Sequence, residues 1–227
     1  PAPYRDLKEF TRVAPAFDLV AREALKRYLG AGASAVRFGV PVTDGRPTDL
    51  ANALTELASA IGLDVISLAK VRSTDQDGGV DVVGWKPLAS GGQIFPCHLM
   101  QCTVQVNFKR KPSDIVPAMW VEFLDFGTQP DIGLAVPFAL RADAPELRDV
   151  NWRADLFLDR FGLCEHLDVE ALKRFEPEWS FIHEWVAEER LRYLDRAAKP
   201  SPDRPARRRK AGGRPKPAPK KTPPKGP

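Results

Sequence analysis

The chain has 227 residues, of which 43% are hydrophobic and 28% are charged, with a formal net charge of +4 at pH 7. These values are near the average for globular proteins and support one main domain with a sizeable core. No stretch approaches the roughly 20 apolar residues that span a bilayer, no signal peptide opens the sequence, and three cysteines do not suggest a disulfide framework. We therefore expect a cytoplasmic protein without a membrane partner.

Residues 1–46 are predicted to form an N-terminal helical segment that packs on the core. Apolar residues recur near helical spacing from Leu7 to Tyr28, and Pro15 is expected to break this run into two helices. Glycines at positions 30 and 32 should end the helical run, and residues 36–40 should form a short strand.

Residues 47–145 are predicted to form the α/β core, beginning with a helix over Thr48 to Ile61. Leucines at spacings of three and four mark its apolar face, with Thr48 as the expected N-terminal cap and Gly62 as the stop. Glu56 lies far from the apolar stripe and is expected to face solvent.

The next segment is predicted to be an antiparallel hairpin that turns at residues 90–92. If 80–85 pairs with 96–107 around Gly91, the numbers of facing residues sum to 182, and Asp81 faces Gln101. Facing residues point to the same side of the sheet, and side chains alternate between sides. We therefore expect Asp81 and Gln101 side by side, with His98 and Cys102 on the opposite face.

Polar side chains continue along the predicted face of Gln101, at positions 103, 105 and 107. Oxygen-rich side chains of this kind suit a hard cation and a phosphate group. The alternative is an ordinary solvated face of an antiparallel sheet.

Two further buried strands are expected at 118–126 and 132–140, followed by helices over 152–197 within a C-terminal helical segment, 146–198. Strands flanked by helices at both ends indicate an α/β fold with a central mixed β-sheet flanked by helices.

Residues 199–227 form a Pro-rich tail with eleven basic residues and one acid, so the tail carries +10 and the remainder −6. Such a segment buries too little apolar area to fold and is expected to be disordered. Basic blocks attract nucleic acid without reading sequence, and the alternative is a solubilising terminus or a tether to an acidic partner. The candidate nucleic-acid-binding residues are Arg207, Arg208, Arg209, Lys210, Arg214, Lys216, Lys220 and Lys221.

The run TDQDGGVDVVGWK at 74–86, followed by LMQC at 99–102, resembles the core of the PD-(D/E)XK nuclease superfamily, particularly its restriction-endonuclease-like and bacterial defence-associated members. The resemblance implies a restriction-endonuclease-like core in which Asp81 and Gln101 hold Mg²⁺ or Mn²⁺ beside a catalytic lysine. The usual lysine position is Thr103 here, so Lys109 or Lys111 is expected to supply the positive charge.

The same resemblance implies an acid on the helix before these strands. In the helix over 48–61 the acids are Asp49 and Glu56, and neither falls at the family's position. Asp49 and Asp77 remain further metal-ligand candidates. Asp75 and Asp77 lie just before the glycines at positions 78 and 79. Asp is common before Gly in turns, so a role in the turn is the alternative for both residues.

The expected function is therefore metal-dependent hydrolysis of nucleic acid, DNA in preference to RNA, as the nuclease component of a bacterial defence system with other protein subunits. The alternative is a nuclease-like fold that has lost its chemistry and serves as a nucleic-acid-binding or assembly subunit, which Thr103 and the missing helix acid would allow.

Other chemistries find less support in the sequence. A zinc site could in principle draw on Cys97, His98, Cys102, Cys164 and His166, but no CxxC pair occurs. The chain has no GxSxG, GxxxxGK[ST] or GxGxxG motif. His183 is expected on a helix surface rather than as a general base.

Overall fold

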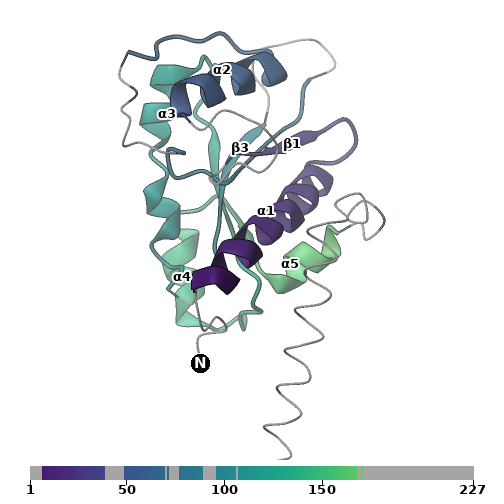
Figure 1. Ribbon diagram of the computed structural model, residues 1–227. Coiled ribbons are helices and arrows are strands. Elements are labelled where there is room, and N and C mark those ends of the chain that lie inside the picture. The colour runs from purple at the N-terminus through teal and green to yellow at the C-terminus, as the bar shows by residue number, and fades with distance from the viewer. Residues whose placement is uncertain are drawn as a thin grey trace, which may run out of the picture. The chain divides into compact units, whose positions relative to one another are not determined.

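A five-stranded mixed sheet flanked by helices forms the centre of the computed structural model, which has an α/β fold (Figure 1). The structure describes residues 7–38, 49–69, 71, 77–88, 96–105, 107–167 and 170, with side chains from residue 13 onward. All of them belong to one compact unit, residues 1–184. Within these ranges, no helix is both long and apolar enough to cross a membrane.

The sheet has the strand order β1-β2-β3-β4-β5. The strands are β1 (Ser34–Arg37), β2 (Val82–Trp85), β3 (Cys97–Cys102), β4 (Asp131–Ala135) and β5 (Leu156–Leu158). β1 and β3 each run antiparallel to β2, whereas β4 is parallel to β3 and β5 is parallel to β4. The helices are α1 (Leu7–Leu29), α2 (Leu50–Ile61), α3 (Pro117–Phe123), α4 (Pro145–Asn151) and α5 (Arg160–Glu165), with a 3₁₀ turn, η1 (Lys111–Asp114).

The predicted hairpin register is confirmed in the paired residues. Val82 faces Met100 and Trp85 faces Cys97, so facing numbers sum to 182 as expected. The predicted turn at 90–92 lies outside the described residues.

One face of the sheet is covered by α2 and α3. Leu54 of α2 and Trp120 of α3 join Val83 and Leu99 of the sheet in one buried apolar cluster. On the same face, by strand alternation, a second apolar cluster consists of fully or nearly fully buried side chains, namely Leu134, Val136, Phe108 and Val150 of α4. This face forms most of the core.

The opposite face is covered by α1, which packs on β1 and β2. A Cβ atom at Gly84 would lie 2.5 Å from the Leu25 Cδ2 atom, so the absent side chain lets α1 approach the sheet closely. Helix α5 contacts both α1 and β5. The α1 face therefore brings residues from the start of the chain against the central strands.

The predicted break at Pro15 is wrong, because α1 is helical on both sides of it. A proline removes one backbone hydrogen bond and strains the helix without having to end it. Ala21, Ala24 and Leu25 are fully buried against the sheet, and this packing holds the helix through the proline. The helix ends before Gly30, which has a φ of 87°.

The prediction for α2 is confirmed in its extent, but its cap is Asp49. The Asp49 Oδ1 atom accepts a hydrogen bond of 2.9 Å from the Asn52 N–H, and Gly62 closes the helix at a φ of 85°. Glu56 is exposed, as expected.

Two further elements differ from the sequence prediction. The strand expected at 118–126 is the helix α3, since Pro117 occupies its first turn and Trp120, Phe123 and Leu124 are buried at helical spacing. Within 152–197, predicted as helical, residues Leu156–Leu158 form the edge strand β5. A three-residue strand is too short to show alternation, and pairing with β4 decides its conformation.

Candidate metal centre

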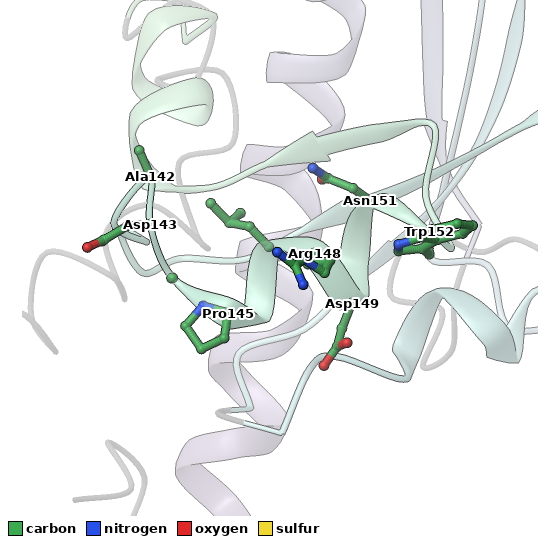
Figure 2. Close-up of a pocket in the computed structure, with 9 residues that line it drawn as sticks. Ala142, Asp143, Pro145, Arg148, Asp149, Asn151 and Trp152 are labelled. Carbon is green, nitrogen blue, oxygen red and sulfur yellow. The ribbon is translucent and has the colours of Figure 1, made fainter.

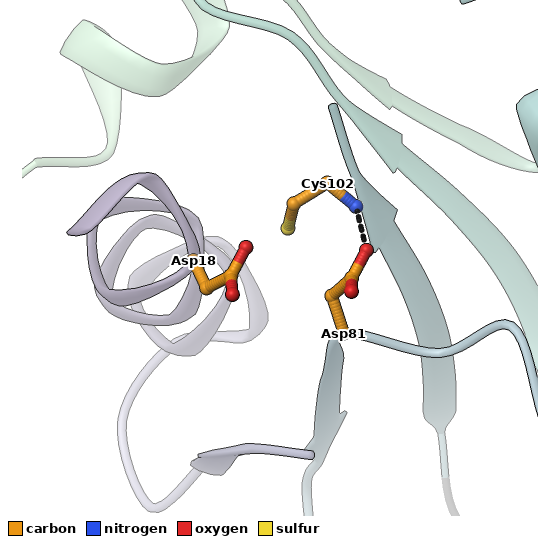
Figure 3. Close-up of side chains that lie close together, drawn as sticks. All are labelled: Asp18, Asp81 and Cys102. Carbon is orange, nitrogen blue, oxygen red and sulfur yellow. Dashed lines mark hydrogen bonds between the residues drawn. The ribbon is translucent and has the colours of Figure 1, made fainter. Parts of the chain in front are cut away.

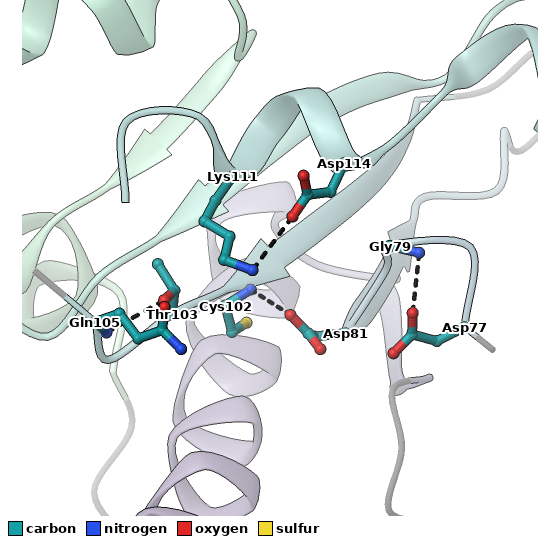
Figure 4. Close-up of polar contacts among 8 residues, drawn as sticks. All are labelled: Asp77, Gly79, Asp81, Cys102, Thr103, Gln105, Lys111 and Asp114. Atoms are coloured by element: carbon teal, nitrogen blue, oxygen red, sulfur yellow. Dashed lines mark hydrogen bonds and ion pairs between the residues drawn. The ribbon is translucent and has the colours of Figure 1, made fainter. Parts of the chain in front are cut away.

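Asp81 lies in a bend directly before β2. Its N–H donates to the Met100 carbonyl at 3.0 Å, and its carbonyl accepts from the Phe38 N–H at 2.6 Å. Its Oδ2 atom accepts a hydrogen bond of 2.7 Å from the Cys102 N–H. Backbone groups of both neighbouring segments therefore fix Asp81, and Figure 4 shows the bond from the Cys102 N–H.

The Asp81 carboxylate turns toward Cys102, which strand alternation places on the face opposite Gln101. Strict alternation would put Val80 and Val83 on opposite faces, yet both belong to the cluster under α2 and α3. The bend between them shifts the alternation by one residue and directs Asp81 to the α1 face. The hairpin register was predicted correctly, but the extension of its alternation to Asp81 was not.

Asp18 of α1 meets Asp81 and Cys102 on that face, as Figure 3 shows. One potential ligand atom from each of the three residues lies within 4.8 Å of the others. Asp18 is 7% exposed, so this acid is buried between helix and sheet. Within the described part of the chain, Asp18, Asp81 and Cys102 are the one group of three or more acidic, cysteine or histidine side chains close enough to share a metal ion.

Arg37 of β1 holds the other side of Asp18. Its Nε atom donates to the Asp18 Oδ2 atom at 3.2 Å. Counting side-chain atoms alone, Arg37 is 3% exposed and Asp18 is 10% exposed. A buried carboxylate of this kind requires a partner, because desolvating an unpaired charge is costly. Arg37 therefore balances Asp18, one of the two acids of the centre.

The electrostatics of the centre reflect that imbalance. Burial raises the pKa of Asp81 to about 7, against the hydrogen bond from the Cys102 N–H, which lowers it. Burial, followed by the Asp81 charge, raises the pKa of Asp18 well above its ordinary value despite Arg37. Burial also raises the pKa of the Cys102 thiol. Each group is short of positive charge, which a proton or a cation would supply.

The two candidate lysines lie in different surroundings. Lys111 of η1 forms an ion pair of 3.2 Å with Asp114, and its charge lowers the pKa of Asp81. Lys109 forms an ion pair of 3.4 Å with Glu146 of α4. Lys111 is thus the lysine whose charge acts on the centre.

The remaining predicted positions have local roles. Asp77 closes a turn by accepting from the Gly79 N–H at 2.9 Å, and its charge raises the pKa of Asp81. Asp49 caps α2 and is exposed. Gln101 is 8% exposed, and its Oε1 atom has no hydrogen-bond partner.

Thr103, at the usual lysine position, is buried. Its N–H donates to the Ala135 carbonyl at 3.0 Å, and its Oγ1 atom accepts from the Gln105 N–H at 3.2 Å. Both hydrogen bonds hold the end of β3 in place. Thr103 provides no positive charge at this position.

The cysteines and histidines considered for zinc are dispersed in the structure. Cys97 belongs to the cluster under α2 and α3, whereas Cys164 is exposed on α5. His98 approaches Asp131 at 3.7 Å and packs edge-on against Tyr28. Of these candidates, Cys102 is the one that joins the acidic centre.

A surface hollow of about 1010 Å³ lies around α4 and the loop before it (Figure 2). Its lining includes Trp152, which is 84% exposed, and Arg148. None of the candidate centre residues lines this hollow.

No family model, no curated protein and no solved structure matches the chain.

Sequence reasoning missed Asp18 and Arg37. The helix acid was expected within 48–61, but this helix covers the sheet face opposite to the α1 face. A signal was present, because Asp18 follows Phe17 and precedes Ala21 by three positions, on the apolar side of its helix. The predicted tail residues 199–227, Asp75 and His183 lie outside the described residues.

Proposed function

We propose that this chain hydrolyses phosphodiester bonds in nucleic acid with a divalent cation held between Asp18 and Asp81. The observation that carries the proposal is the meeting of a helix carboxylate and a strand carboxylate on one face of a mixed sheet. The resemblance to PD-(D/E)XK nucleases implies such a helix acid beside the strand aspartate. Asp18 supplies it from α1 rather than from α2.

The donor chemistry fits a divalent cation. Carboxylate oxygens are its preferred ligands, and each acid has one oxygen already oriented, by the Arg37 Nε–H or by the Cys102 N–H. Outer hydrogen bonds of this kind fix the direction of metal ligands. When bound, a divalent cation activates water and offsets negative charge on the phosphate.

The protein groups around the centre have separate tasks in this proposal. Asp18 and Asp81 hold the cation, and Lys111 offsets charge that develops on the phosphate. Hydrolysis adds one water molecule across a P–O bond, leaving a phosphate monoester and a hydroxyl group. Nucleic acid is the proposed substrate, with DNA ahead of RNA, and a defence system with further subunits is the setting that the resemblance implies.

A second candidate function is a nucleic-acid-binding or assembly subunit without hydrolytic activity. The buried ion pair between Arg37 and Asp18 favours it, because a guanidinium already balances one acid. The buried Thr103 at the usual lysine position points the same way.

A cleavage assay on the full chain decides between the two. Single- and double-stranded DNA and RNA are incubated with Mg²⁺, Mn²⁺ or Zn²⁺ and with EDTA. We expect cation-dependent cleavage that Asp81→Asn abolishes and that Lys111→Ala slows by roughly 10²-fold or more. The matched control is Asp143→Asn, an exposed carboxylate paired with Arg141, which should cleave like the wild type.

If the wild-type chain binds nucleic acid but cleaves none of these substrates with any of the three cations, the hydrolytic proposal fails and the binding-subunit function replaces it. Cleavage that persists undiminished in Asp81→Asn would remove the centre from the chemistry.

A further inference from the structure

Cys102 gives the acidic centre a sulfur donor that a magnesium site does not need. Its side chain lies on the same side of the sheet as the Asp81 carboxylate and faces Asp18 of α1 (Figure 3). Its own N–H is bound to Asp81, so the backbone that carries the thiol is held in place by the same acid.

We infer that Cys102 is a third ligand of this centre and makes it selective for a zinc-type divalent cation over Mg²⁺. The inference rests on the cation centre of the proposed function and names its metal class. Thiolate ligands favour Zn²⁺ and softer ions, whereas sites for Mg²⁺ are built from oxygen donors.

The distances suit one ion with three protein ligands. Zinc binds sulfur at about 2.3 Å and carboxylate oxygen at about 2.0–2.2 Å, so two ligand atoms of one tetrahedral ion lie about 3.4–3.7 Å apart. The three ligand atoms lie within 4.8 Å of one another. Side-chain rotations that move these atoms together by about 1 Å bring them into range.

The ligand count also suits catalysis. Catalytic zinc sites hold three protein ligands and leave a fourth position for water or substrate, whereas structural sites are closed by four. Asp77, whose charge also acts on Asp81, stays bound to the Gly79 N–H in its turn and lies outside the group of three. A three-ligand centre therefore keeps one position open.

The charge balance agrees with a bound thiolate. As the sulfur–metal bond forms, the S–H proton leaves to solvent, and a divalent cation then faces two carboxylates and one thiolate. Arg37 and Lys111 offset the remaining negative charge, since both act electrostatically on Asp81.

Cd²⁺ is a suitable probe, because its bond to sulfur produces an ultraviolet charge-transfer band. The full chain is titrated with Cd²⁺ as wild type, Cys102→Ser and Cys164→Ser. We expect a band that saturates at one Cd²⁺ per chain in the wild type and in Cys164→Ser, whose thiol is exposed on α5. Cys102→Ser should lose the band and bind Zn²⁺ on the order of 10- to 100-fold more weakly, with Mg²⁺ binding unchanged.

A ¹¹³Cd NMR spectrum of the wild-type chain gives a second readout that needs no variant. A chemical shift in the range of one sulfur ligand supports the inference, and a shift typical of oxygen-only coordination overturns it. A charge-transfer band that survives in Cys102→Ser overturns it as well.

The two proposals fail in different ways. If the band follows Cys102 but no cation supports cleavage, the hydrolytic function fails and the ligand assignment stands. If Mg²⁺ supports full cleavage in Cys102→Ser and Cd²⁺ gives no band in the wild type, the hydrolytic function stands and the ligand assignment fails.

Discussion

Asp81 carries a carboxylate that the cation-free protein does not fully compensate. The buried Arg37 guanidinium pairs with the buried Asp18 and acts on the half-buried Asp81 through its charge, yet desolvation raises the pKa of Asp81 to about 7. Functional centres commonly hold such unfavourable groups at a cost in stability. Removal of the charge should therefore stabilise the cation-free fold.

We predict that Asp81→Asn raises the free energy of unfolding in EDTA at pH 8 by about 1–2 kcal/mol, because a neutral amide loses the desolvation cost and keeps an oxygen for the Cys102 N–H. Urea unfolding measures the change, with Asp143→Asn as the exposed control. A lower stability for Asp81→Asn would show that the negative charge is well compensated.

His98 gives a separate pH dependence on the same sheet face. Burial lowers its pKa, while the Asp131 and Asp155 carboxylates oppose this shift. As the pH falls, His98 is therefore protonated in the unfolded state near its ordinary pKa of about 6.5, and in the folded state only at lower pH. Stability from His98 is present above that pH and is lost on acidification toward the lowered folded value.

We predict that wild type loses stability relative to His98→Gln between pH 7 and pH 5. The two proteins are compared by the difference between their free energies of unfolding. This difference removes the effect of Asp81, whose raised pKa gives the opposite dependence of stability on pH in both proteins. Unfolding in urea at several pH values measures it, and a difference that is flat with pH would contradict the assignment.

At the scale of elements, α1 positions the centre by its close approach to β2. Gly84 makes this approach possible, since an added Cβ would lie 2.5 Å from the Leu25 Cδ2 atom. Asp18 lies about two turns before Leu25 on the same helix. A displacement of α1 should therefore move Asp18 away from Asp81.

We predict that Gly84→Ala costs about 1–3 kcal/mol of stability through overpacking and also weakens Mn²⁺ binding. Gly162→Ala in α5 is the control, because its Cβ would meet Leu158 at an ordinary 3.4 Å. Calorimetric unfolding and Mn²⁺ titration measure the two effects. Unchanged Mn²⁺ affinity in a destabilised Gly84→Ala protein would separate α1 from the centre.

The elements also show why part of the fold was predictable. The β2–β3 register follows from alternation around a glycine turn, and α2 follows from its leucine spacing and Gly62. The helix α3 was read as a strand, because a short apolar run fits both patterns until its packing is known. The position of Asp18 on the apolar side of α1 indicates burial, but Asp18 was missed because no local pattern reveals which face of the sheet each helix covers.

At the scale of the whole molecule, the acidic body and the basic tail should contribute differently to binding. Residues 199–227 carry +10 and the remainder −6. A basic segment contributes affinity through counterion release, which weakens steeply with salt. The centre on the α1 face would instead determine cleavage once nucleic acid is bound.

We predict that deletion of 199–227 weakens nucleic-acid binding and flattens its salt dependence, while cleavage at saturating substrate persists. Fluorescence anisotropy from about 50 to 200 mM salt measures the slope of affinity against salt. An unchanged slope would assign the phosphate contacts to the body of the protein.

The central claim is that Asp18 and Asp81, from a helix and a strand bend far apart in the sequence, hold one cation together. Mn²⁺ binding to the full chain, followed by electron paramagnetic resonance, tests it most directly. We predict one Mn²⁺ per wild-type chain and per Asp143→Asn chain, and loss of this site in both Asp18→Asn and Asp81→Asn, each checked for folding by circular dichroism. Wild-type Mn²⁺ binding in either folded variant would contradict the claim.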